Sequence, residues 1–311
     1  MNATPPVRAV YEADGLYEQL LLPHYFDGIS DTGLIASWMI QHFGEPAPSR
    51  RIAEFGCGTG RITTTLASYA GELVLADYSK TMIDAVTARF PQARTICADT
   101  RDAVGVLLDE HGACQFDLVT SFWSLSYPLG EYFETMTPAG DICAQPDPLL
   151  ARAQAAGFVE RLVDLLVPGG HLLVWLFDSD SPEQQLVTRA WEKVAPFPDG
   201  GRAYTRTMLL DALRDAEARG RGTLTYSRLA GAAVAQDTAA GREWFFGEHF
   251  KHHPLLLADL ALCDEVEAFL ARHRLPDGRV AIPSGAYVID FRAVAHPYFS
   301  LPACSLPGDP S

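Results

Sequence analysis

The sequence predicts an α/β fold in which a mostly parallel sheet is covered by helices on both faces. Strand-like apolar runs alternate with helical periodicity from Arg51 to Phe177, as parallel strands require, because each needs a crossover connection. A glycine-rich run, I-A-E-F-G-C-G-T-G-R, joins the first predicted strand to the first helix. The polar residues of this half follow predicted strand ends, the edge where such sheets bind ligands.

Composition and charge limit the kind of partner. The chain has 311 residues, of which 48% are hydrophobic and 20% charged, as in a globular protein with a full core. Its net charge of −15 makes binding to nucleic acid or to an anionic membrane unfavourable. The first residues contain no apolar signal core, and the six cysteines have no C-x-x-C spacing. We therefore expect a cytoplasmic protein with reduced cysteines and a small-molecule substrate; a homodimer stays open.

Residues 1–45 are predicted to form an N-terminal helical cap. Apolar residues recur at helical intervals between Ala9 and Phe43. Three polar aromatic residues, Tyr17, His24 and Tyr25, lie near a break at Pro23. They either anchor a helical layer on the sheet or form a lid that contacts the ligand.

The central region, residues 46–180, is predicted to be the cofactor-binding core. Its strands are expected at Ile52–Phe55, Glu72–Ala76, Thr95–Cys97, Phe116–Thr120 and His171–Phe177. Its helices are expected at Ile62–Ala70, Ser79–Phe90, Asp99–His111 and Phe158–Leu166. The long segment Trp123–Ala156 contains many aromatic residues, so we interpret it as part of a substrate wall.

Residues 181–311 are predicted to add a helical insertion and to complete the sheet and the substrate pocket. Helices are expected at Pro182–Val194, Thr207–Arg219 and Cys263–His273. Strand-like runs occur at Gly222–Leu229, Arg242–Phe250 and Ala286–Val294.

The glycine run has the properties of a nucleotide site. Glycines at alternate positions permit positive φ angles and let a ligand lie against the backbone. Asp77 closes the second strand, where a carboxylate can accept hydrogen bonds from both ribose hydroxyls. Asp99 follows the third strand and is positioned to accept from the amino group of a purine. Either aspartate could instead cap the helix that follows it.

The glycine spacing distinguishes two classes of cofactor. Dinucleotide sites use G-x-G-x-x-G, whereas this chain has G-x-G-x-G followed by Arg61. Glu54 precedes the run, where it suits the amino group of an amino acid better than a pyrophosphate. The spacing therefore favours a sulfonium nucleoside over a nicotinamide cofactor.

Five motifs, in order, resemble those of class I S-adenosylmethionine-dependent methyltransferases of the small-molecule type. They are E-F-G-C-G-T-G-R, L-A-D-Y-S-K-T-M, A-D-T, F-D-L-V-T-S-F-W-S-L and L-V-P-G-G-H-L-L-V, spread over about Arg51 to Phe177. The resemblance implies a Rossmann-like fold with a seven-stranded, mostly parallel sheet ending in an antiparallel strand. It also implies S-adenosyl-L-methionine as cofactor and methyl transfer by direct displacement at the sulfonium.

Carried onto this sequence, the resemblance assigns roles to individual residues. Gly56, Gly58 and Gly60 would line the methionine part of the cofactor, Asp77 would hold the ribose and Asp99 would meet the adenine amino group. Tyr78 and Met82 would flank the adenine, and Ser121 and Phe122 would lie beneath the methionine. The complete expected cofactor set is Tyr25, Glu54, Gly56, Cys57, Gly58, Thr59, Gly60, Asp77, Tyr78, Met82, Asp99, Thr100, Ser121 and Phe122.

Substrate and catalytic residues are less sharply indicated. Aromatic faces suit a sulfonium and an apolar substrate, which makes Tyr17, Trp123, Tyr127 and Trp244 the expected substrate-binding residues, with ordinary packing as the alternative. A base that removes a proton from the acceptor would be His249, His24 or Asp178. His249 could instead only bond to backbone or water.

The sequence thus predicts an enzyme of specialised metabolism that methylates an oxygen or nitrogen atom, less readily a carbon atom, of a small, partly apolar molecule. His249 and His253 lie four residues apart beside Glu248, but direct methyl transfer needs no metal, so none is expected. Two alternatives stay open: a protein that binds the cofactor as a sensor or scaffold, and a nicotinamide-dependent oxidoreductase.

Overall fold

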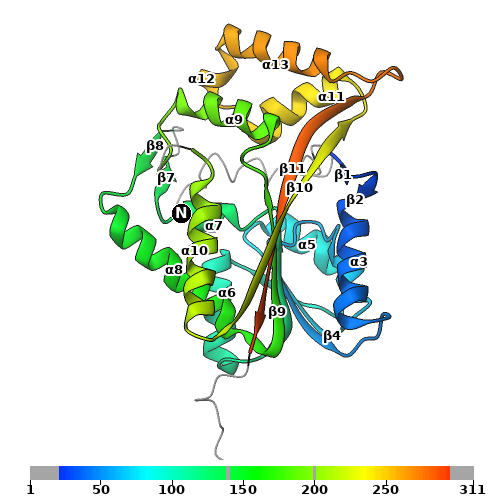
Figure 1. Cartoon of the computed structure of the whole chain (residues 1–311), viewed down its shortest axis with the longest axis vertical. Coiled ribbons are helices and arrows are strands. Elements are labelled where there is room, and N and C mark those ends of the chain that lie inside the picture. Colours follow the sequence, from blue (N-terminus) through cyan, green and yellow to red (C-terminus); the bar gives the residue numbers. More distant parts are fainter. Residues whose placement is uncertain (1–20, 138–140, 199–200, 295–311) are drawn as a thin grey trace, which may run out of the picture.

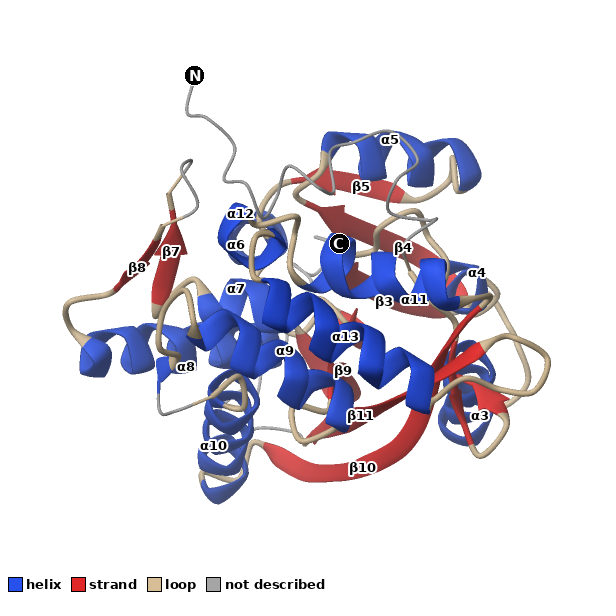
Figure 2. Ribbon diagram, turned by 90° about the horizontal axis from the view of Figure 1, so that it is seen from above, coloured by secondary structure: helices blue, strands red, loops and turns tan. Residues whose placement is uncertain are grey.

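The computed structural model describes residues 21–137, 141–198 and 201–294, which form a twisted sheet with helices on both faces (Figures 1 and 2). Within these ranges the main sheet has nine strands in the order β2-β1-β10-β11-β9-β6-β3-β4-β5. The strands are β1 His24–Phe26, β2 Ile29–Ser30, β3 Arg50–Phe55, β4 Ala70–Asp77, β5 Arg94–Cys97, β6 Phe116–Phe122, β9 Leu166–Phe177, β10 Gly222–Ala235 and β11 Val280–Ala293. A separate hairpin pairs β7 Glu134–Met136 with β8 Ile142–Ala144.

Helices connect these strands. They are α3 Asp31–Phe43, α4 Thr63–Ala67, α5 Lys80–Arg89, α6 Thr100–His111, α7 Ser126–Gly130, α8 Pro148–Asp164, α9 Pro182–Glu192, α10 Tyr204–Ala218, α11 Thr238–Glu243, a π-helix at Trp244–His249, α12 Pro254–Leu257 and α13 Leu260–Arg272. None of them is both long and apolar enough to cross a membrane, as far as the described residues go.

The topology confirms the predicted fold class. Strands β9, β6, β3, β4 and β5 run parallel, and β11 lies antiparallel to both β9 and β10. These are seven strands, the number that the family resemblance implies, and they account for seven of the eight predicted strand-like runs. The count was too low, however, because β1 and β2 pair onto β10 and extend the sheet to nine strands.

Three apolar clusters hold the layers together. One packs α6, α8 and α10 on one face of the sheet, and a second packs α3, α4 and α5 on the other. The third lies beyond the carboxyl end of β9 and joins α9, the π-helix and α13 (Figure 1). This third cluster forms a helical layer above the strand ends, where a ligand site is expected.

The prediction for the N-terminal segment was wrong over residues 21–30, which are extended and not helical. Asp27 and Gly28 both have positive φ angles, 48° and 81°, and form a two-residue turn between β1 and β2. The predicted helix begins only at Asp31, where the Ser30 side chain accepts a hydrogen bond from the Gly33 amide. Residues 1–20, including Tyr17, lie outside the described residues.

Two other segments differ from their predictions. Arg242–Phe250 is helical, in α11 and the π-helix, rather than strand-like. Its aromatic residues are buried on every side, so the sequence offers no apolar-polar periodicity that would separate a helix from a strand. Trp123–Ala156 is not one long loop, because it contains α7, the β7–β8 hairpin and the start of α8. Asp147 caps α8, and Pro148 occupies its first turn.

Candidate functional site

Two adjoining cavities lie at the carboxyl edge of the parallel strands. The narrower one is bounded by the glycine loop and the ends of β4 and β5. The larger one, with a volume of about 440 Å³, lies between α7, β7, α9, α10 and the π-helix. Four residues line both cavities: Tyr127, Glu131, Phe177 and Glu248. The two cavities therefore meet at these four residues, which form a shared wall.

The glycine loop forms one side of the narrower cavity through Gly56 and Gly58. Gly56, Gly58 and Gly60 have φ angles of 69°, 53° and 85°, which L side chains rarely adopt. A Cβ atom on Gly56 would lie 2.2 Å from Ser124 Oγ. The absence of side chains leaves loop backbone at the cavity surface, as the alternating spacing indicates.

Asp77 lies at the end of β4 and also lines the narrower cavity. Its carboxylate accepts hydrogen bonds from the amides of Gly58 (3.0 Å) and Ser79 (2.9 Å). Burial raises the pKa of this carboxyl, and the backbone hydrogen bonds act in the opposite direction. Ser79, whose side chain accepts from the Met82 amide, is itself the cap of α5. Asp77 therefore ties the glycine loop to the strand end.

Asp99 caps α6 and is engaged by Arg101. It accepts from the Arg101 amide at 2.9 Å and from the guanidinium at 2.7 and 3.0 Å. Arg101 also contacts Glu131, a residue of the shared wall. Asp99 and Thr100 line the narrower cavity, together with Tyr78 and Met82. Asp99 therefore both caps α6 and forms part of the surface of the narrower cavity.

The other expected cofactor residues lie outside both cavities. Those that line neither cavity are Tyr25, Glu54, Cys57, Thr59, Gly60, Ser121 and Phe122. Glu54 is buried beneath the loop and accepts from Thr63 Oγ1 at 2.5 Å. Burial, aided by the nearby Asp77, raises the pKa of Glu54 to about 8. The Ser121 hydroxyl bonds to that of Ser124, at 2.7 Å, and Ser124 itself lines the narrower cavity.

An ion pair fixes α3 against the glycine loop. Arg61, the residue after Gly60, donates two hydrogen bonds to buried Asp31, at 2.9 and 2.7 Å. The Trp123 indole donates to the same carboxylate at 3.3 Å. Burial acts to raise the pKa of Asp31, but the Arg61 guanidinium outweighs it and the pKa is lowered. Trp123, with a positive φ of 63°, is thereby held in the wall of the narrower cavity.

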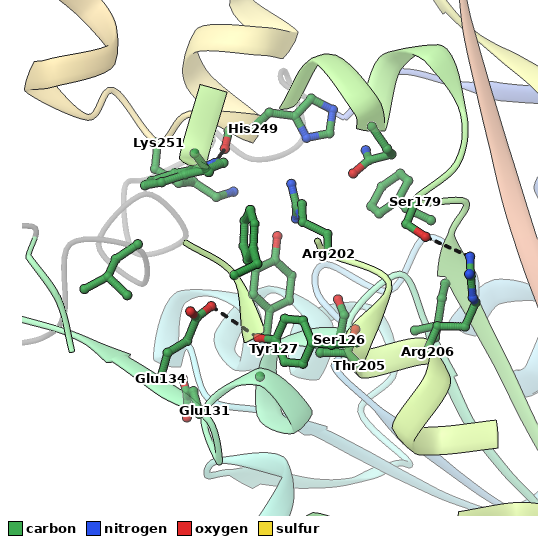
Figure 3. Close-up of a pocket in the computed structure, with 18 of the residues that line it drawn as sticks. Ser126, Tyr127, Glu131, Glu134, Ser179, Arg202, Thr205, Arg206, His249 and Lys251 are labelled. Atoms are coloured by element: carbon green, nitrogen blue, oxygen red, sulfur yellow. Dashed lines mark hydrogen bonds between the residues drawn. The ribbon is translucent and has the colours of Figure 1, made fainter. Parts of the chain in front are cut away.

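A buried histidine–glutamate pair adjoins the larger cavity. His249, in the π-helix, lines this cavity (Figure 3). Its Nε2 lies 3.0 Å from Glu183 Oε1. Glu183, in the first turn of α9, has no solvent exposure. It also accepts from the Trp244 indole and, at 2.6 Å, from Ser284 Oγ. Burial opposes the charge of Glu183, yet the hydrogen bonds from His249 and Ser284 help to lower its pKa to about 2.

An ionised Glu183 determines the tautomer of His249. A carboxylate can only accept, so Nε2 carries the proton that is donated to it. Nδ1 has no hydrogen bond to any described residue, and it is not among the buried atoms. It is therefore the ring nitrogen that is available for a molecule in the larger cavity. Glu183 was not anticipated from the sequence, because an acidic residue in the first turn of S-P-E-Q resembles an ordinary helix start.

The two other expected bases lie elsewhere. His24 is buried against Trp123 and Trp244, and burial lowers its pKa. Asp178 is buried and accepts from Arg228 Nε at 2.7 Å. Neither lines a cavity.

Of the expected substrate residues within the described ranges, Tyr127 lines both cavities and Trp123 only the narrower one. Trp244 lies behind them, donating to Glu183.

A candidate metal-ligand cluster within the described ranges lies away from these cavities. The ligand atoms of His42, His171 and Asp290 all lie within 4.8 Å of one another. His171 Nδ1 already lies 2.8 Å from Asp290 Oδ1. None of the three lines either cavity, so the cluster contributes nothing to their chemistry.

Comparison with known proteins agrees with this geometry. A family model described as a methyltransferase domain matches residues 52–137, which include the glycine loop, Asp77 and Asp99. A phosphoethanolamine N-methyltransferase from Triticum aestivum is 27% identical over 126 residues, which is 40% of this chain. The chain spans only 20% of the length of that relative.

One solved structure shows the same fold at low identity. The cyclase SpnF superimposes with a TM-score of 0.51 and 13% identity, over 95% of this chain and 99% of that one. The N-methyltransferase NodS from Bradyrhizobium japonicum, in complex with S-adenosyl-L-homocysteine, has a TM-score of 0.45 and 14% identity, with 93% and 99% of the two chains covered.

Proposed function

We propose that this chain is a class I S-adenosylmethionine-dependent methyltransferase that methylates an oxygen or nitrogen atom of a small, partly apolar molecule. The observation that carries the proposal is the wall shared by the two cavities. The narrower cavity has the glycine loop and Asp77 that a sulfonium nucleoside requires. The larger cavity has room for an acceptor and a histidine on its surface. We further propose that the reaction takes place in the cytoplasm, in specialised metabolism.

The residues of the narrower cavity suit the cofactor. Gly56 and Gly58 present backbone without side chains, and Asp77 offers carboxylate oxygens to a ribose. Tyr78 and Met82 supply flat and polarisable surfaces for a purine, and Asp99 adds an acceptor. S-adenosyl-L-methionine would bring the electrophilic methyl group, so the protein must mainly orient the acceptor and accept its proton. Orientation alone can lower the barrier by about 7–11 kcal/mol in favourable cases.

His249 is the proposed base. Its Nε2–H group donates a hydrogen bond to Glu183. Nδ1 would therefore remove the proton from a hydroxyl or amine as the methyl group is transferred. Glu183 would stabilise the imidazolium that results, since its carboxylate is ionised and buried. Phe177, Trp191 and Phe197 give the cavity apolar walls that exclude water around this step.

The proposed division of labour follows the three segments of the chain. Residues 46–180 would hold the cofactor. The segment after residue 180 supplies α9, α10 and the π-helix, which line the larger cavity, and would therefore choose the acceptor. Of the first segment, Leu21 lines the narrower cavity, which fits a role in covering the cofactor.

Calorimetry and a transfer assay test the proposal in sequence. S-adenosyl-L-methionine and S-adenosyl-L-homocysteine should both bind at micromolar concentration, and labelled methyl groups should move into members of a panel of small phenols and amines. Binding of a nicotinamide cofactor alone would contradict the proposal. Cofactor binding without turnover across a broad panel would instead favour a sensor or scaffold.

A further inference from the structure

The larger cavity is lined by three cations, and two of them have partners in the protein. Arg206 donates to Ser179 Oγ at 2.7 Å and to Asp180 at 3.1 Å (Figure 3). Lys251 pairs with Glu248 at 2.9 Å. Their charges are therefore compensated before any ligand enters.

Arg202 differs from both. Its Nη1 atom is buried and has no hydrogen-bond partner among the described residues. No carboxylate of the described residues lies within 4.0 Å of its guanidinium. Figure 3 shows its side chain projecting into the middle of the cavity, below His249 and Lys251. The chain thus places an uncompensated guanidinium where a substrate would lie.

Glu134 also lines the larger cavity and is influenced by the charge of Arg202, but its carboxyl is engaged elsewhere. It accepts a hydrogen bond from the Tyr204 hydroxyl at 3.2 Å. Burial raises the pKa of Glu134, and Arg202 only moderates this effect through the longer-range field of its charge. Glu134 is therefore not a hydrogen-bonded counter-ion of Arg202.

We propose that the methyl acceptor carries an anionic oxygen acid, a carboxylate or a phosphate, that pairs with Arg202. Arg202 is half-buried, but its Nη1 atom is shielded from water without a partner, and an anion supplied by the ligand would give that atom one. The planar guanidinium offers two parallel donors that match a carboxylate or phosphate, whereas a neutral amide matches only in part. The apolar walls strengthen the pairing by excluding water. The inference rests on the proposed function, because it assigns the larger cavity to the acceptor.

The test uses matched probes on the full chain saturated with S-adenosyl-L-homocysteine. Benzoate, phenyl phosphate and uncharged benzamide are titrated by calorimetry, since each has an aromatic ring for the apolar wall and they differ in charge. We expect the wild type to bind one of the two acids at least tenfold more tightly than the amide. Which acid is preferred distinguishes a carboxylate from a phosphate.

Variants then test whether Arg202 causes the preference for the acid over the amide. Arg202→Gln should abolish it without changing the affinity for S-adenosyl-L-homocysteine, and Arg202→Lys should keep only part of it. Arg214→Gln, on an exposed part of α10, removes the same charge away from the cavity and should leave the preference intact. If Arg202→Gln does not fold, the test rests on Arg202→Lys, which should lose part of the preference for the acid over the amide.

The outcomes separate this inference from the proposed function. If benzamide binds as tightly as both acids, if neither acid binds at millimolar concentration, or if the Arg202 variants keep the full preference, the inference is overturned. If S-adenosyl-L-homocysteine itself does not bind, the proposed function fails first.

Discussion

The two cavities are built in different ways. The narrower one uses short consecutive stretches at the ends of β3, β4 and β5, and much of its surface is backbone or residues next to it. The larger one collects side chains from α7, β7, α9, α10 and the π-helix, which are far apart in the sequence. The comparison teaches that a cavity made by local backbone geometry can be predicted from sequence motifs. A cavity assembled from distant side chains cannot.

If the larger cavity performs the chemistry, loss of its histidine should have the largest effect. His249→Gln should lower the rate of methyl transfer by about 10²–10⁴-fold, because a general base is removed. Cofactor affinity should stay unchanged, since His249 does not line the narrower cavity. Single-turnover transfer and calorimetry measure the two quantities. His252→Gln, at an exposed histidine nearby, is the control. If His249→Gln weakened cofactor binding by as large a factor as it slowed methyl transfer, the two cavities would not have the separate roles proposed for them.

The glycine loop tests the narrower cavity. Gly56→Ala should weaken S-adenosyl-L-homocysteine by roughly a hundredfold, because strain of about 1–2 kcal/mol at positive φ is added to a clash with Ser124. Gly112→Ala provides a matched control: its φ is 75°, but its Cβ would meet nothing within 4 Å. Calorimetry and thermal unfolding of both variants separate strain from clash. Equal behaviour of the two would mean that close packing at Gly56 is unimportant.

Asp77 should have a smaller effect on the same cavity. Asp77→Ala should weaken the cofactor by at least tenfold, since a charge-assisted hydrogen bond contributes about 1.5–3 kcal/mol. The variant Asp84→Asn, at an exposed carboxylate that forms a surface ion pair, controls for the loss of one negative charge. Unchanged affinity of Asp77→Ala would remove the ribose role from this carboxylate.

The last expected effect is on folding stability rather than on the cofactor or the rate, and it concerns pH and the support beneath the glycine loop. Glu54 has a folded pKa of about 8 against an ordinary value of 4.5, so the folded state holds a proton that the unfolded state releases. Its contribution to stability is present below pH 4.5 and is lost as pH rises to about 8, on the order of 1 kcal/mol per pH unit. Urea unfolding of the ligand-free protein should show this decline. Glu54→Gln should flatten it, and a parallel decline in both proteins would refute the assignment.

Much of the fold could be predicted because the core follows local patterns. The parallel strands and their helices appear where alternation and periodicity place them. The N-terminal hairpin could have been found from Asp27-Gly28, a dipeptide typical of two-residue hairpin turns, but the helical spacing of the leucines obscured it. The aromatic run at Trp244–Phe250 gave no usable period, since its side chains are buried on all sides.

The two cavities likewise differ in how far their residues could be predicted. Asp77, Asp99 and the glycines could be proposed as candidates because they follow strand ends or show a recognisable spacing. Glu183 and Arg202 could not, because their meaning depends on partners from distant elements: Glu183 meets His249 across the fold, and Arg202 stands out only because its neighbours pair with other groups. No single stretch of sequence contains that information.

The central claim is that the narrower cavity holds the cofactor and presents its sulfur to the larger one. A crystal structure with S-adenosyl-L-homocysteine tests it most directly. We predict the ribose at Asp77 and the sulfur at the wall formed by Tyr127 and Phe177, facing His249. Electron density for the ligand in the larger cavity, or with its sulfur turned away from that wall, would contradict the account.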